Sequence, residues 1–178
     1  NIYLSFISQN YWGLDSLMNP FIHTWSLGVE AQFYFLYPLI IWFTGYGQKK
    51  KKGSINLLIT LIFLTIISLI LFVNFYTSNQ SFAYFLMPFR FWEISIGSLL
   101  FLGHEKRSFI NKILKFFNPS LCLILILVLM YMPKSYGDIT TILVVILSTF
   151  LIASLRDGTY AFKILTQDKV VYLGLISY

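Results

Sequence analysis

The sequence predicts an all-α membrane protein, a bundle of transmembrane helices with about five complete spans plus the start of a sixth. Two observations predict this fold class. Of the 178 residues, 57% are hydrophobic and only 11% are charged, with a mean hydropathy of +0.74. The apolar residues also gather into stretches that approach the ~20 residues a helix needs to cross a bilayer. A water-soluble fold of this size cannot bury so much apolar surface, so lipid must be part of the solvent.

Five apolar stretches follow one another, separated by short polar connectors. They cover residues 25–46, 55–76, 82–103, 119–133 and 138–155. The last two are short, and we expect their helices to extend into the flanking residues or to tilt less than the others. A further apolar segment starts at Val170 and runs to Tyr178. We therefore expect residues 1–178 to form a single membrane domain that is partial, an internal fragment of a longer one.

The basic residues predict how this domain is oriented. Eleven of the thirteen Lys and Arg residues fall in three alternate connectors, at residues 48–54, 104–118 and 156–169. The other connectors hold only Lys134, and Arg90 lies within a predicted helix. Positively charged connectors stay in the cytoplasm, so we expect the N-terminal segment outside and the C-terminal end on the cytoplasmic side. The net charge of +6 then indicates contact with anionic membrane lipids and no nucleic acid.

Three charged residues, Glu30, Arg90 and Glu93, fall within the apolar stretches. A charge near a helix centre costs about 2.5–3.5 kcal/mol, so each needs a partner, a cavity or a function. At about 1.5 Å per residue from the outer helix ends, they lie roughly 8, 12 and 16 Å deep. They can meet in one outward-facing cavity if their helices are neighbours. Arg90 and Glu93 are three residues apart and can pair, and a structural ion pair is as consistent with the sequence as a catalytic one.

His23 precedes the first stretch by two residues and Glu30 by two helical turns. If the helix includes His23, the two side chains share a face about 10 Å apart and can flank a substrate. An ordinary histidine at the membrane boundary is the alternative. Cys122 is the only cysteine, which leaves no disulfide or cysteine-based metal site, and we expect no bound metal.

Three segments resemble the acyltransferase 3 family, integral-membrane enzymes that modify bacterial surface polysaccharides and peptidoglycan. Residues 23–34, HTWSLGVEAQFY, closely resemble the family signature. Residues 88–93, PFRFWE, followed by Gly97, resemble its R-x-W-E-x-x-x-G helix, and residues 173–178, LGLISY, resemble its L-G-x-I-S-Y segment. The resemblance spans nearly the whole chain. The family domain has about ten membrane helices. The resemblance therefore implies that this chain is the middle half of such a domain, with a further catalytic histidine before Asn1.

The resemblance implies an acyltransferase that moves an acetyl or other short acyl group to a hydroxyl of an extracytoplasmic glycan. The glycan is a surface polysaccharide, lipopolysaccharide or peptidoglycan, and the acyl donor is acyl-CoA from the cytoplasm, with no resident cofactor. In this interpretation His23 serves or assists as base, and Glu30 orients it or the sugar. Arg90 with Glu93 supplies the positive charge that holds the oxyanion. Contacts to the substrate are expected from Trp25, Ser26, Gln32, Tyr34 and Trp92.

Two other classes of protein remain open on the sequence. A transporter or flippase for a glycan or small anion also places Glu and Arg within the membrane, and it typically has repeated halves with interrupted helices. No internal repeat is visible in the sequence. A purely structural membrane subunit would keep Glu and Arg out of its spans. The sequence makes no prediction of oligomeric state.

Overall fold

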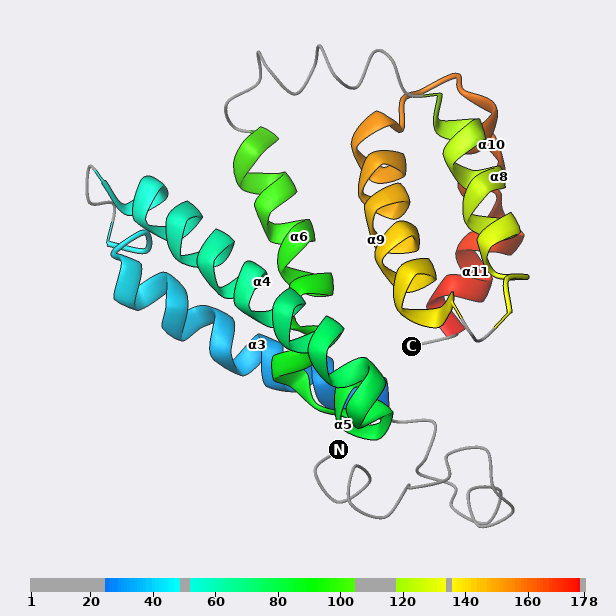
Figure 1. Ribbon diagram of the computed structural model, residues 1–178. Coiled ribbons are helices and arrows are strands. Elements are labelled where there is room, and N and C mark those ends of the chain that lie inside the picture. The colour runs from blue at the N-terminus through cyan, green and yellow to red at the C-terminus, as the bar shows by residue number, and fades with distance from the viewer. Residues whose placement is uncertain (1–24, 49–51, 105–117, 134–135, 177–178) are drawn as a thin grey trace. The chain divides into compact units, whose positions relative to one another are not determined.

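The computed structural model describes residues 25–48, 52–104, 118–133 and 136–176, and these residues form helices and connectors without a strand (Figure 1). The all-α prediction is confirmed. The chain divides into two compact units between Leu102 and Gly103. Across the described residues, three helical segments are long and apolar enough to cross a membrane, namely Ser26–Thr44, Gly53–Ser78 and Gly137–Ser154.

The first unit contains four described helices. They are α3 (Trp25–Thr44), α4 (Gly53–Ser78), α5 (Gln80–Phe85) and α6 (Met87–His104). Helices α3 and α4 pack against each other, and both contribute with α6 to one apolar core (Figure 1). The core residues are Val29, Phe33, Ile40, Leu57, Leu61, Met87, Phe91 and Leu102.

The rest of the α4 surface exposes large apolar side chains. These include Ile55, Ile59, Ile62, Phe63, Ile66, Ile70 and Val73. Exposed apolar surface of this extent would drive aggregation in water, whereas lipid tails solvate it. The side of α4 that faces the core also carries the polar residues Thr65 and Ser68, both buried. The helix is therefore built to separate lipid from a partly polar interior.

Two glycines allow the close approach of the ends of α3 and α4. Gly45 follows α3 with φ 73°, a left-handed conformation that residues with a Cβ rarely adopt. Gly53 begins α4 so near this turn that a Cβ on it would lie 2.7 Å from the carbonyl oxygen of Gly45. The Gly-Tyr-Gly sequence at residues 45–47 thus has a structural use, the end of a helix and a tight connection.

The stretch expected as one helix over residues 82–103 is interrupted at Leu86. This residue is extended, with φ −96° and ψ 133°, and it separates α5 from α6. Pro88 explains the interruption, because it has no N–H to donate and its ring clashes with a preceding helical turn. In the first turn of α6 the missing N–H is not needed. Helix α6 therefore starts only three residues before Arg90.

In the second unit, α8 (Pro119–Leu129) packs against α9 (Gly137–Ser154). Asn118 caps α8, its side-chain oxygen accepting a hydrogen bond of 3.1 Å from the backbone N–H of Ser120. The helix has 11 residues, fewer than the expected stretch of 119–133. Its last residue is Leu129, and Pro133 disfavours helical conformation in Met132, so the helix does not continue to residue 133.

Two short helices complete this unit, α10 (Tyr160–Leu165) and α11 (Asp168–Ile176). Gly158, with φ 89°, precedes α10, whose N-cap Thr159 accepts a hydrogen bond from the backbone N–H of Phe162. Helix α11 covers the start of the expected sixth apolar segment, which is helical over its described residues.

Candidate functional site

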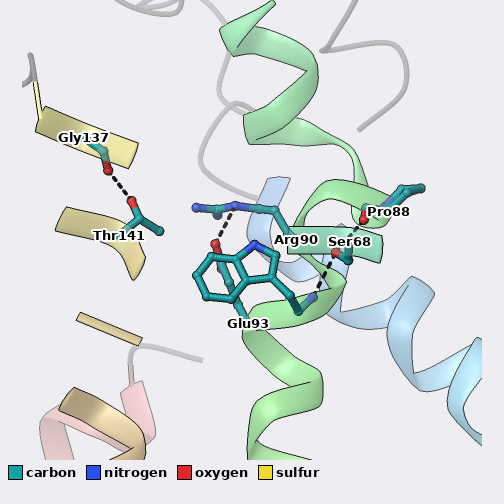
Figure 2. A network of polar contacts seen from close by, with 7 residues as sticks. Ser68, Pro88, Arg90, Glu93, Gly137 and Thr141 are labelled. Atoms are coloured by element: carbon teal, nitrogen blue, oxygen red, sulfur yellow. Dashed lines mark hydrogen bonds and ion pairs between the residues drawn. The ribbon is translucent and has the colours of Figure 1, made fainter. Parts of the chain in front are cut away.

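Arg90 and Glu93 form an ion pair within the first two turns of α6. The distance from Arg90 Nε to Glu93 Oε1 is 3.3 Å, and the two side chains are only 16% and 21% exposed. Figure 2 shows the two side chains lying toward each other. The pairing expected from their spacing is confirmed. Because little water reaches these side chains, each charge is stabilised mainly by the other. Removing one charge alone would therefore destabilise the protein.

The ring of Tyr84 lies against the guanidinium group of Arg90. The Cζ atom of Arg90 is 4.7 Å from the centre of this ring, within the range of a cation–π interaction. Tyr84 belongs to α5, so the interruption at Leu86 lets a side chain from one short helix cover a charge on the next. Arg90 is thereby held by a carboxylate and by an aromatic face.

Trp92 lies between these two charges in sequence but points into the helix packing. Its side chain is 1% exposed, and its ring centre lies 5.6 Å from that of Phe72 on α4. Its indole Nε1 has no hydrogen-bond acceptor within the described part of the chain. The polar end of this expected substrate contact therefore remains a buried donor, an arrangement that costs free energy unless a ligand or water accepts the bond.

Three directions around α6 carry different residues. Phe91 packs against Phe33 of α3, with ring centres 5.4 Å apart. Ser95 faces α4, where its hydroxyl is 2.7 Å from that of Thr65. At 100° per residue, Arg90 and Glu93 lie roughly 100–160° around the helix from Phe91. The ion pair therefore lies on a different side of α6 from the contact with Phe33.

The α3 residues of the predicted site lie beside this packing. Glu30 is partly buried, next to the core residue Val29, and it forms no ion pair with another described residue. The contact between Phe33 and Phe91 makes α3 and α6 neighbours, which meets the condition for a shared cavity. The structure thus joins Arg90 to Glu93 but does not join Glu30 to either.

The remaining predicted residues differ in their surroundings. Ser26, Gln32 and Tyr34 are exposed on α3, and the backbone of Trp25 is in the same helix. His23 lies outside the described residues. Among the residues that the structure does describe, no three His, Cys, Asp or Glu side chains are grouped in a way that could hold a metal ion.

Comparison with known proteins found relatives that carry O-acetyltransferase names. The chain is 34% identical to O-acetyltransferase OatA of Staphylococcus aureus over 98 residues, which is 53% of this chain and 16% of that protein. A second S. aureus protein, provisionally named an O-acetyltransferase, is 27% identical over 180 residues, 95% of this chain and 30% of its own length. An uncharacterized protein of Haemophilus influenzae is 38% identical over 109 residues, 59% of this chain and 43% of that protein.

The chain thus spans less than half the length of each of these relatives. No family model matches the chain, and no solved structure matches it significantly. The relatives' names support an acyltransferase, and together with the apolar helices they support a membrane protein.

Proposed function

We propose that the chain is part of a membrane-bound acyltransferase of the acyltransferase 3 type. It transfers an acetyl or other short acyl group from cytoplasmic acyl-CoA to a hydroxyl of a glycan outside the cytoplasm. The observation that carries this proposal is the shielded Arg90–Glu93 pair, at 3.3 Å, on a scaffold similar to proteins named O-acetyltransferase. Ionisable residues in a stretch expected to cross the membrane commonly mark a functional site.

The reaction defines what the site must supply. The oxygen of the hydroxyl forms a bond to the carbonyl carbon of the acyl group, and the carbon–sulfur bond of the thioester breaks. A base accepts the hydroxyl proton, which passes to the departing thiolate. The carbonyl oxygen carries a negative charge in the tetrahedral intermediate, and a fixed positive group beside it stabilises that charge.

Each role has a candidate in the chain. Arg90 supplies the positive group, and its guanidinium is oriented by Glu93 and by the ring of Tyr84. His23 serves or assists as base, and Glu30 orients it or the acceptor sugar. The exposed side chains of Ser26, Gln32 and Tyr34 on α3, with Trp25, contact the substrate, whereas the buried indole N–H of Trp92 is available only to a ligand or water that enters the helix packing.

Four single substitutions in the full-length protein test these roles, namely His23→Ala, Glu30→Gln, Arg90→Ala and Glu93→Gln. We expect each to reduce the acetate released by alkali from the surface glycan, with Arg90→Ala losing about 100-fold or more. Membrane abundance is measured in parallel. Arg156→Ala and Asp168→Asn are the matched controls, because both remove an exposed charge from the second unit.

The same assay separates the site from its alternatives. Normal acylation in His23→Ala and Glu30→Gln would refute the roles of these two residues. Loss of folded protein in Arg90→Ala or Glu93→Gln, without loss of activity per folded molecule, would instead make the pair structural. A transporter or flippase would move its substrate without adding any alkali-labile acyl group.

A further inference from the structure

The hydroxyl of Ser68 on α4 forms hydrogen bonds with two backbone groups of α6, those of Pro88 and Trp92. It donates to the carbonyl oxygen of Pro88 at 2.6 Å, as Figure 2 shows, and it accepts from the backbone N–H of Trp92 at 3.1 Å. In an α-helix the N–H of residue 92 ordinarily bonds to the carbonyl of residue 88. Ser68 therefore contacts both members of that pair from the side.

This bridge acts on the turn that carries the ion pair. Arg90 lies midway between the two bridged residues, and Glu93 directly follows Trp92. A side chain inserted at an i to i−4 position bends or opens a helix locally. The relative placement of the Arg90 and Glu93 side chains thus depends on a hydroxyl that belongs to another helix.

The position of Ser68 is itself fixed. Its side chain is 3% exposed, and it lies in the row of α4 residues that face α6, one turn from Thr65. Both hydrogen-bonding functions of the hydroxyl are used, one as donor and one as acceptor. The bridge is therefore satisfied at both ends within an apolar interface, where such bonds are strong.

We infer that Ser68 is a positioning residue of the acyltransferase site, which sets the geometry of Arg90 and Glu93 by bridging Pro88 and Trp92. This inference rests on the proposed function. Ser68 acts through the turn and touches no reacting atom. Without its hydroxyl, the N–H of Trp92 can still bond to the carbonyl of Pro88, so the helix persists but the turn changes shape. The expected consequence is a site that folds and binds donor but reacts slowly.

Ser95 supplies a matched control on the same interface. Its hydroxyl is 2.7 Å from that of Thr65, and its side chain is as fully buried as that of Ser68. Removing the Ser68 hydroxyl deletes two polar contacts between α4 and α6, and removing the Ser95 hydroxyl deletes one, together with a 3.2 Å hydrogen bond to the carbonyl oxygen of Trp92 within α6. Only Ser68 bridges the turn that contains Arg90.

The test compares Ser68→Ala, Ser68→Thr and Ser95→Ala in the full-length protein, in isolated membranes that contain the native glycan. Radiolabelled acetyl-CoA is the probe, and kcat and KM for acetyl-CoA are normalised to folded protein. We expect Ser68→Ala to lower kcat about tenfold or more with KM within about twofold, since small misplacements of reacting groups are costly. Ser68→Thr keeps the hydroxyl and is expected to retain at least about half of kcat, and Ser95→Ala to stay near wild type.

A second measurement shows whether Ser68 acts through Arg90. In an Arg90→Lys background, Ser68→Ala should have a much smaller effect on kcat than in the wild type, because the group being positioned is altered. Equal effects in both backgrounds would overturn the inference, as would equal losses in Ser68→Ala and Ser95→Ala. If the wild type itself transfers no acetyl group, the proposed function fails instead.

Discussion

Arg90 carries most of the chemistry assigned to this chain, and its environment explains how. The carboxylate of Glu93 forms an ion pair with its Nε at 3.3 Å, without a hydrogen bond between those two atoms, and the ring of Tyr84 lies against the guanidinium. Arginine stays charged at any physiological pH and presents its donors in a rigid plane. A positive group held in this way needs little reorganisation when negative charge develops beside it.

A double substitution distinguishes a catalytic pair from a structural one. Removing one charge leaves the other shielded from water and unpaired, whereas removing both together, as in Arg90→Met with Glu93→Gln, costs little stability. We expect the single Glu93→Gln variant to lose membrane abundance and the double variant to recover it. The double variant should nevertheless release no glycan-bound acetate above background.

Abundance is measured by fluorescence-detected size exclusion and acetate by alkaline release. Recovery of both abundance and acylation in the double variant would show that the pair serves only the fold.

At the residue scale, the sequence predicts contacts well only between residues that are close together along the chain. The pairing of Arg90 with Glu93 follows from three residues of helical spacing and was predicted correctly. Tyr84 and Ser68 were not predicted as partners of this turn. Their positions depend on the interruption of the helix at Leu86 and on the packing of α4 against α6. The polar residues Thr65 and Ser68 of α4 are visible in the sequence, but nothing there indicates which groups of α6 they contact.

At the scale of the helices, one proline sets where α6 begins beside the site, and two glycines allow the close connection between α3 and α4. Pro88 starts α6 close to Arg90, and the preceding interruption frees α5 to cover the charge. The five apolar stretches predicted five helices, and helices are found in each. The ends of these helices were predicted less well, because a hydropathy pattern does not show where a helix is interrupted before Pro88 or ends before Pro133.

Gly53 is predicted to be intolerant of a side chain. A Cβ there would meet the backbone of Gly45 at 2.7 Å and that of Tyr46 at 2.9 Å, and backbone atoms cannot rotate away. We expect Gly53→Ala to destabilise the protein by about 1–3 kcal/mol, as overpacking does. The melting temperature of the purified full-length protein in detergent measures the effect.

Gly97→Ala is the control for this prediction, because its Cβ would have nothing within 4 Å. This variant should melt at or above the wild-type temperature, since alanine favours a helix over glycine. A melting temperature for Gly53→Ala equal to that of the wild type would contradict the close approach of α3 and α4.

At the scale of the whole molecule, the composition predicted an all-α protein in lipid, and the described helices with their exposed apolar faces agree. The orientation of the chain across the membrane remains a prediction from the basic connectors. It determines whether the ion pair is reached from the outside, the side on which we propose that the acceptor glycan lies.

Cysteine labelling tests that orientation. In a full-length protein whose native cysteines, including the buried Cys122, are replaced by alanine, single cysteines are introduced as Gln48→Cys or Tyr131→Cys. Both positions are exposed, and Tyr131 is 90% exposed. A membrane-impermeant maleimide should label Tyr131→Cys in spheroplasts and label Gln48→Cys only after permeabilisation. The opposite pattern would reverse the topology.

The central claim is acyl transfer, and the most direct measurement of it uses the purified full-length protein. The protein is reconstituted into membranes that contain native glycan from the producing bacterium, and radiolabelled acetyl-CoA is supplied to the cytoplasmic face. The account predicts alkali-labile label on the glycan with the wild type and about 100-fold less with Arg90→Ala. Label that never becomes covalently attached to the glycan, or equal attachment by the folded Arg90→Ala variant, would contradict it.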